Sequence, residues 1–102
     1  MNLSRPSVSV VIPAHDRPEY LVQALDSVMS QTHQPDEIIV VDDASSVDLM
    51  SVALSYPREI RFVRQQAKKG ANAARNAGAA LATSDLIAFL DDDDIWLAQK
   101  LE

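Results

Sequence analysis

The segment EIIVVDD at residues 37–43 decides the fold class, because an unbroken apolar run ends there in two adjacent carboxylates. Strands with one solvated face alternate apolar and polar residues, whereas strands buried on both faces of a parallel sheet are apolar at nearly every position. Residues 85–91, DLIAFLD, repeat the second pattern and also end in aspartate. Both segments are therefore predicted to be strands buried on both faces.

Two further apolar segments, SVSVVIP at residues 7–13 and EIRFVRQ at residues 59–65, complete a set of four expected strands. A helical pattern follows the first of them at residues 17–32, where Pro18 suits the first turn. Apolar side chains recur there at helical spacing and predict one buried stripe. The stripe consists of Tyr20, Leu21, Ala24, Leu25 and Val28.

Two more helices are expected between the remaining strands. Residues 47–55 form the shorter one, capped by Ser45 or Ser46 and ended before Pro57. Residues 70–83 are rich in alanine, and their small side chains allow close packing on a sheet. This alternation predicts an α/β fold, a Rossmann-like, mostly parallel sheet of about four strands with flanking helices. The length of 102 residues fits a single domain.

Composition excludes several classes of protein. The formal net charge of −6, from 15 acidic and 9 basic residues, argues against nucleic acid as a partner. The sequence has no cysteine, so disulfides and thiolate metal sites are excluded. Its apolar runs are too short for a signal peptide or for the ~20 residues of a transmembrane helix. We expect a cytoplasmic protein and leave peripheral contact with a membrane open.

Polar residues follow each expected strand. They read PAHDR at 13–17, DDASS at 42–46, RQQAKKG at 64–70 and DDDD at 91–94. The carboxyl ends of parallel strands meet at one edge of the sheet, where open α/β sheets bind their ligands. The sequence therefore predicts a single site built from segments that lie far apart along the chain.

The four consecutive aspartates need a counterion or a hydrogen-bonding role, because two carboxylates about 5 Å apart repel by about 3 kcal/mol at an effective dielectric near 20. Residues two apart in an extended segment point to the same side, so Asp91 and Asp93 can converge on one hard divalent cation, Mg²⁺ or Mn²⁺. Asp94 is expected to cap a helix that starts near Ile95 and is packed by Trp96.

The remaining candidates concern a nucleotide. An acid at the end of a second strand, such as Asp43, can accept hydrogen bonds from a ribose or base, although the same segment could simply form a turn that caps the next helix. The sequence lacks a glycine-rich phosphate loop, so phosphates would need a metal and scattered cations. The candidate cations are Arg17, Lys68, Lys69 and Arg75, and the lysines could equally belong to a solvated loop. His15 is the histidine expected at the crevice.

Taken in order, SVVIPAHDR, EIIVVDDAS, GANAARNAG and DLIAFLDDDDIW resemble the amino-terminal half of the family 2 glycosyltransferases, which have the GT-A fold. The resemblance covers nearly the whole chain. It implies a nucleotide-diphosphate-sugar donor and a divalent metal, Mg²⁺ or Mn²⁺, bound through an Asp-x-Asp motif. It further implies that Pro13, Ala14 and His15 line the nucleoside pocket, that Asp43 bonds the base, and that Arg75 lies near the nucleotide or its phosphates.

For the acidic run, the resemblance implies that Asp91 or Asp92 holds the ribose or assists the metal, and that Asp93 is a metal ligand. The sequence departs from the usual family pattern at three positions. The family usually has glycine where Ala44 stands, asparagine where Asp16 stands, and often serine at Asp92. Ala44 then requires either a backbone outside the left-handed region or some strain.

The resemblance also implies inverting transfer of the sugar to an acceptor hydroxyl, with the catalytic base in a further half of the family's domain. Residues 1–102 are therefore expected to form one truncated nucleotide-sugar-binding domain that contains no catalytic base and no acceptor half. Two alternatives remain: a receiver-like signalling module that binds Mg²⁺, and a non-catalytic remnant. The apolar edge at residues 85–90 also predicts self-association into a homo-oligomer.

Overall fold

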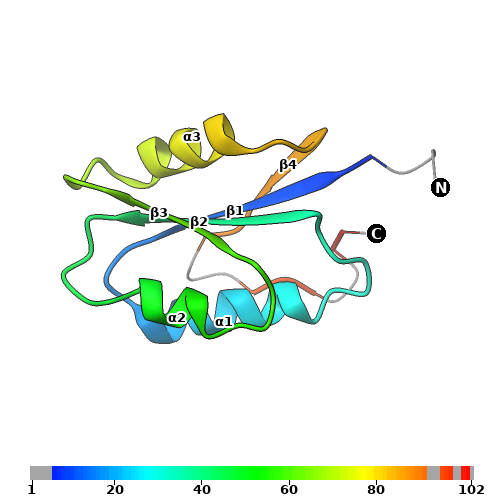
Figure 1. Ribbon diagram of the computed structural model, residues 1–102, viewed down its shortest axis with the longest axis horizontal. Helices are drawn as coiled ribbons and strands as arrows, with labels where there is room; N and C mark the ends of the chain where they lie inside the picture. The colour runs from blue at the N-terminus through cyan, green and yellow to red at the C-terminus, as the bar shows by residue number, and fades with distance from the viewer. Residues whose placement is uncertain (1–5, 92–94, 98–99, 102) are drawn as a thin grey trace.

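The computed structural model describes residues 6–91, 95–97 and 100–101, and within these ranges it contains one parallel sheet of four strands in the order β3-β2-β1-β4. Figure 1 gives the arrangement. Strands alternate with helices along the chain, as the sequence predicted. The elements are β1 (Val8–Ala14), α1 (Pro18–Met29), β2 (Glu37–Asp43), α2 (Met50–Leu54), β3 (Arg61–Gln65), α3 (Ala71–Leu81) and β4 (Leu86–Phe89).

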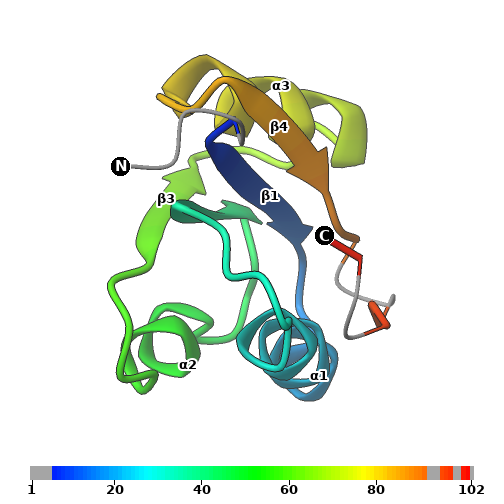
Figure 2. The same cartoon turned by 90° about the vertical axis from the view of Figure 1, so that its right-hand side faces the viewer.

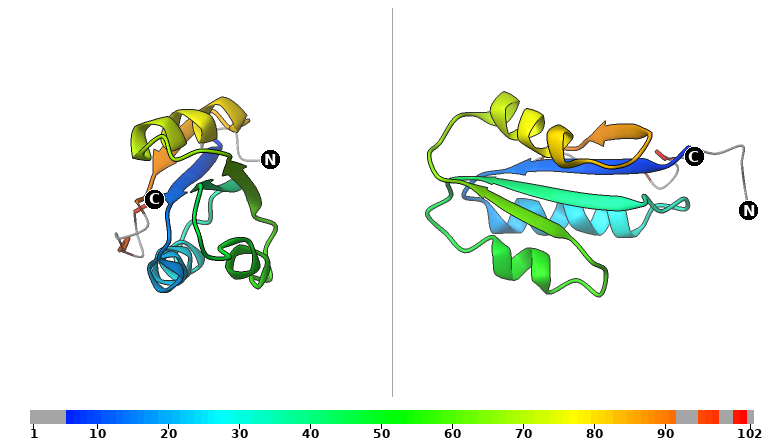
Figure 3. Two further views of the ribbon diagram at one scale, coloured as in Figure 1. Left: turned by 90° about the vertical axis from the view of Figure 1, so that its left-hand side faces the viewer. Right: turned by 45° about the horizontal axis from the view of Figure 1, so that its top comes forward.

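Helices cover both faces of the sheet. α1 and α2 lie on one face and α3 on the other (Figures 1 and 2). From β1 the chain winds outward through β2 to β3, and then α3 returns it across the sheet to β4, on the far side of β1. Figure 3 places β3 and β4 at opposite edges. The winding direction thus reverses between β1 and β4, where such sheets form a crevice at the carboxyl ends of their strands.

The central strands form the core. Every residue of β1 and all of β2 except Glu37 are buried, so the continuous apolar pattern of residues 37–43 correctly predicted a strand enclosed on both faces. The expected stripe of α1 is confirmed for Leu21, Ala24, Leu25 and Val28, which pack beneath the sheet. Tyr20 is the exception, since it is 37% exposed. Pro18 begins the helix as predicted.

The alanine-rich helix α3 packs closely on the central strands. A Cβ atom added to Gly78 would lie 2.3 Å from Cγ1 of Val11, so the helix can approach β1 only because this position has no side chain. Ala74 is fully buried in the same small cluster as Val11 and Val41. The small side chains at positions 70–83 therefore allow the close packing on the sheet that the sequence predicted.

Strand β4 corrects the expectation that residues 85–91 are buried on both faces. Leu86, Ile87 and Phe89 are 52%, 39% and 45% exposed. The reason is position: among the described residues β4 pairs with β1 alone and lies at an edge of the sheet, while α3 packs on β1 and β2. Its continuous apolar pattern therefore did not correctly predict burial on both faces.

Two predicted helix starts are also wrong. Helix α2 begins after Leu49, and the side chain of Asp48 accepts the N–H of Ser51 in its first turn. Ser45 and Ser46 bond the loops beside the crevice instead. The helix expected near Ile95 does not begin within the described residues 95–97, which are not helical. There the side chain of Gln31 bonds the backbone of Leu97 and Leu101 and holds this segment against α1.

Candidate functional site

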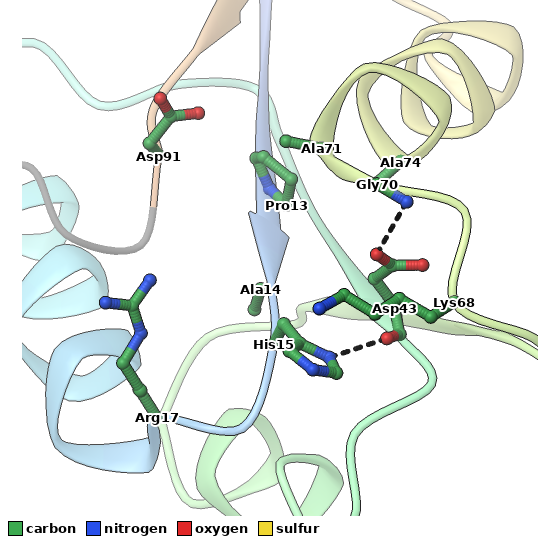
Figure 4. A pocket seen from close by; sticks show the side chains of 10 residues that line it. All are labelled: Pro13, Ala14, His15, Arg17, Asp43, Lys68, Gly70, Ala71, Ala74 and Asp91. Atoms are coloured by element: carbon green, nitrogen blue, oxygen red, sulfur yellow. Dashed lines mark hydrogen bonds between the residues drawn. The ribbon is translucent and has the colours of Figure 1, made fainter.

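A crevice of about 290 Å³ lies at the carboxyl ends of the strands (Figure 4). It is at the edge where the sequence predicted that the polar segments would meet, close to the point where the sheet reverses its winding. Residues from all four strand ends or the connections after them contribute to its wall. They are Pro13, Ala14, His15, Arg17, Asp43, Lys68, Gly70, Ala71, Ala74 and Asp91.

The loops that follow β1 and β2 are bonded to each other. His15 donates from Nδ1 to the backbone oxygen of Asp43 at 2.7 Å. The backbone N–H of Asp16 donates to the hydroxyl of Ser45 at 2.8 Å, and the N–H of Ser46 returns a bond to Oδ1 of Asp16 at 2.6 Å. These reciprocal contacts fix one wall of the crevice, because neither loop can move without breaking bonds to the other.

Asp16 carries its charge within that network. The backbone N–H of Ser46 holds the pKa of the Asp16 carboxyl below its ordinary value of 3.8, and the hydroxyl of Ser46 and the nearby His15 and Lys68 act in the same direction. Asp16 and Ala44 both have a left-handed backbone, at φ 60° and 55°. Aspartate tolerates this region better than alanine does, so Ala44 is the strained member of the pair.

Asp43 organises the connection between β3 and α3. Its side chain is almost completely buried, and its two oxygens accept the backbone N–H groups of Lys69 at 2.8 Å and Gly70 at 2.9 Å. Gly70 has φ 93°, a conformation that a residue with a side chain rarely adopts, and it immediately precedes α3. The carboxylate therefore satisfies N–H groups at the amino end of the helix and favours its positive pole.

Asp42, the neighbouring carboxylate, points elsewhere. It is 1% exposed and forms an ion pair with Arg64 on β3 at 2.8 Å, while its other oxygen accepts the N–H of Ser45 at 3.0 Å. It is not part of the crevice wall. Adjacent residues of a strand face opposite sides of the sheet, so the two aspartates take separate structural roles.

Arg75 and Asp91 join the end of β4 to α3. Nη2 of Arg75 lies 2.7 Å from Oδ1 of Asp91, and Nη1 donates to Oδ1 of Asn72 at 2.8 Å. Asp91 lines the crevice, whereas Arg75 is not part of its wall. Arg75 thus contacts an aspartate of the crevice wall, and its place near the nucleotide or its phosphates stays a prediction.

Of the residues predicted for the site, Pro13, Ala14, His15, Asp43 and Asp91 are brought together around one cavity. Asp92, Asp93 and Asp94 lie outside the described residues. Among the predicted cations, Arg17 and Lys68 line the crevice, while Lys69 contributes its backbone N–H to Asp43.

Sequence analysis missed three wall residues: Gly70, Ala71 and Ala74. The available signal was the lone glycine after two lysines, followed by small residues, which marks a turn into a closely packed helix.

The chemistry of the aspartates suits a hard divalent cation, since such ions take carboxylate oxygens as ligands. Within the part of the chain that the structure describes, however, there is no group of three or more histidine, aspartate or glutamate side chains that could hold a metal ion. Asp91 is the only member of the acidic run inside that part. One of its oxygens accepts Arg75, and a carboxylate can accept further bonds through both oxygens.

Comparison with known protein families now bears on this crevice. The model of the family described as "Glycosyl transferase family 2" matches residues 9–102. The chain belongs to glycosyl transferase family 2. The match extends over both walls of the crevice and confirms the resemblance found in the four sequence segments. Membership of this family also decides against the receiver-like alternative.

Two curated glycosyltransferases are identical to this chain at more than a third of the aligned residues. An uncharacterized glycosyltransferase of Nostoc sp. is 39% identical over 99 residues, which cover 93% of this chain and 30% of the relative. An Escherichia coli protein named UDP-Glc:alpha-D-GlcNAc-diphosphoundecaprenol beta-1,3-glucosyltransferase WfgD is 36% identical over 96 residues, which cover 93% of this chain and 38% of the relative. The chain thus spans about a third of the length of these relatives.

Solved structures of GT-A glycosyltransferases have the same fold. The mannosyltransferase PcManGT from Pyrobaculum calidifontis, in complex with GDP-Man and Mn²⁺, superposes with a TM-score of 0.84 at 27% identity over 95% of this chain and 30% of that one. Staphylococcus aureus TarS in complex with UDP gives a TM-score of 0.84 at 24% identity and supports the fold alone. Within the described residues, no helix has the length and apolar character needed to cross a bilayer.

Proposed function

We propose that this chain binds the nucleoside diphosphate of a sugar donor in the crevice, and that this binding serves transfer of the sugar to an acceptor hydroxyl. The observation that carries the proposal is the convergence of His15, Asp43 and Asp91 from three different strand ends on one cavity at the carboxyl edge of the sheet. Family membership and the GDP-Man and Mn²⁺ complex of the mannosyltransferase neighbour support the same ligand class.

The proposed orientation of the donor follows from the hydrogen bonds that Asp43 already accepts. Helix amino ends attract phosphate, but the carboxylate of Asp43 already occupies the N–H groups before α3 and would repel a second anion. Each oxygen of Asp43 retains a further lone pair that can accept an N–H of a base. We therefore place the nucleoside against Pro13, Ala14, His15 and Asp43, and the diphosphate towards Asp91.

A divalent cation, Mg²⁺ or Mn²⁺, fits the donor set at the other end of the crevice because carboxylate oxygens are the ligands that such ions prefer. We propose Asp91 and Asp93 as its ligands, with Asp92 directed to the ribose or to the metal shell. Bound there, the cation would offset the negative charge that develops on the diphosphate leaving group. Arg75 would keep Asp91 facing the crevice through the ion pair between them.

The roles proposed for this chain are to bind and orient the donor. We assign no catalytic base to residues 1–102. For inverting transfer, a base elsewhere in the enzyme would deprotonate the acceptor hydroxyl as the diphosphate leaves on the opposite side of the sugar. We propose a cytoplasmic location that permits contact with a membrane, because the Escherichia coli relative is named for a diphosphoundecaprenol acceptor, which is lipid-linked.

Calorimetric titration of UDP, GDP and dTDP, each with and without Mn²⁺, tests the proposal. We expect one of these diphosphates to bind, and we expect Mn²⁺ to strengthen binding at least tenfold. Asp43→Asn should weaken nucleoside recognition, and Asp93→Ala should remove the effect of Mn²⁺. Glu59→Gln, at an exposed position just before β3 and outside the crevice wall, is the matched control and should bind like the unmodified chain.

Two results would argue against the proposal. Diphosphate binding that is independent of Mn²⁺ and unaffected by Asp93→Ala would contradict the proposed metal site. A folded chain with no affinity for any of the three diphosphates would support the alternative of a non-catalytic remnant. Circular dichroism distinguishes the second result from simple unfolding.

A further inference from the structure

Arg17 is a cation of the crevice wall to which the account of the donor site gives no role. It lies in the connection from β1 to α1 and is exposed. We propose that Arg17 binds the diphosphate of the donor directly, as a second positive group beside the metal. The inference rests on the proposed function and adds to it a phosphate-binding side chain.

The backbone and an aromatic ring together position Arg17. Its carbonyl oxygen accepts the N–H groups of Tyr20 at 3.2 Å and Leu21 at 3.1 Å, so the residue is fixed at the first turn of α1. Its guanidinium carbon lies 4.9 Å from the centroid of the Tyr20 ring. This contact restricts the Arg17 side chain before any ligand arrives.

Position within the crevice distinguishes Arg17 from the other cations. Figure 4 shows Arg17 and Asp91 on one side of the end of β1, and Asp43 and Lys68 on the other. Asp43 marks the nucleoside end in the proposed orientation, so Arg17 lies on the side assigned to the diphosphate. Arg75 bonds Asp91 and Asn72 and is not among the residues of the crevice wall.

The chemistry of arginine suits this position. A guanidinium group carries five N–H donors in a planar fork that matches two oxygens of a phosphate, and the group stays protonated throughout the physiological range. Because it has several donors, it can serve a phosphate and a protein acceptor together. Hydrogen bonds between ionised partners are about twice as strong as neutral ones. Loss of Arg17 should therefore lower the binding affinity more for ligands whose phosphates carry more negative charge.

A series of ligands that differ only in phosphate number tests the inference by calorimetry. For the base that the unmodified chain prefers, the affinities of the nucleoside, monophosphate and diphosphate are compared with those of Arg17→Gln and Arg17→Lys. We expect Arg17→Gln to weaken diphosphate binding about tenfold, monophosphate binding less, and nucleoside binding not at all. Arg17→Lys should recover part of the loss, because it restores the charge without the fork.

The controls separate direct binding from altered shape. Arg61→Gln removes the same charge from an exposed position at the amino end of β3, outside the crevice wall, and should leave all three affinities unchanged. Tyr20→Leu keeps the guanidinium but removes the ring beside it, and should weaken diphosphate binding about twofold to threefold. Thermal unfolding of each variant verifies that α1 is intact.

Each outcome decides the inference. Unchanged diphosphate affinity in Arg17→Gln overturns it, and so does an equal loss for the nucleoside and the diphosphate, which would mean that Arg17 only shapes the pocket. If the unmodified chain binds a diphosphate but Arg17→Gln does so equally well, the proposed function stands and the role of Arg17 fails. If the unmodified chain binds no diphosphate, both fail together.

Discussion

Arg75 donates a hydrogen bond to Asp91 at 2.7 Å, and this ion pair ties the end of β4 to α3 beside the crevice. The two side chains are 29% and 38% exposed. A pair this exposed contributes little to the stability of the fold, typically about 0–1 kcal/mol. Its importance is therefore expected in the orientation of Asp91 rather than in the free energy of unfolding.

A double-mutant cycle tests this positioning role. Arg75→Gln and Asp91→Asn should each weaken Mn²⁺-dependent binding of the diphosphate about threefold to tenfold, while each changes the free energy of unfolding by less than about 1 kcal/mol. The double variant should lose less than the sum of the two, because both changes break the same contact. Additive losses in calorimetry would show that Arg75 acts independently of Asp91.

Ala44 stores strain that glycine would release. Its φ of 55° lies in the left-handed region, which costs a residue with a side chain about 1–2 kcal/mol. Ala44→Gly should therefore stabilise the protein by about 0.5–1 kcal/mol in urea unfolding, after the greater flexibility of glycine in the unfolded chain is allowed for. Ala80→Gly, at an exposed position within α3, should instead destabilise by about 0.5–1 kcal/mol. A destabilising effect of Ala44→Gly would contradict the assignment of strain.

The loop network around Asp16 predicts a dependence of stability on pH. Hydrogen bonds from Ser46 lower the pKa of Asp16 from 3.8, so the folded state favours the carboxylate more than the unfolded state does. The resulting stabilisation is fully present above pH 3.8 and is lost as pH falls through the lower pKa of the folded state. Asp16→Asn should consequently show a shallower loss of stability below pH 4 in urea unfolding.

Asparagine is the matched substitution because it tolerates the left-handed backbone and still offers an oxygen to Ser46. If the unmodified protein and Asp16→Asn lose stability with the same slope between pH 4 and pH 2, the hydrogen bonds of Ser46 do not favour the charged form. The comparison is made at one ionic strength, since salt screens the contributions of His15 and Lys68.

The open edge of β4 predicts self-association, as the sequence pattern suggested. Leu86, Ile87 and Phe89 are each at least 39% exposed, and in the part of the chain that the structure describes β4 pairs on one side, with β1. Edge strands with apolar side chains pair with copies of themselves unless charges prevent it. Sedimentation should therefore reveal dimers or larger species at high concentration, and Ile87→Lys should shift them towards monomer. A monomer at all concentrations would contradict this prediction.

The sequence correctly predicted the central strands, where a continuous apolar pattern coincides with burial on both faces of the sheet. Residues 37–43 are apolar because both faces of β2 are covered, and the structure confirms this. The same argument failed for residues 85–91, since pattern does not distinguish a central strand from an uncovered edge. That distinction depends on where α3 returns the chain, which is a property of the whole topology.

The site was predicted in position more accurately than in individual contacts. Parallel strands bring their carboxyl ends together, so the meeting of His15, Asp43 and Asp91 followed from the order of the elements. The serines expected to cap α2 instead bond the β1 loop and Asp42. Asp42 also pairs with Arg64, for which the sequence analysis predicted no role. Such contacts depend on side-chain direction in space, which local propensity does not contain.

The most direct test of the central claim is a nuclear magnetic resonance titration of the labelled chain with the preferred nucleoside diphosphate in Mg²⁺. The account predicts amide shifts at the crevice, in Ala14, His15, Asp43, Gly70 and Asp91, with no change at the opposite edge of the sheet near Thr83. Asp93→Ala should reduce the amide shift at Asp91 more strongly than the amide shifts at Asp43 and Gly70. Shifts at Thr83 with none at the crevice would contradict the account.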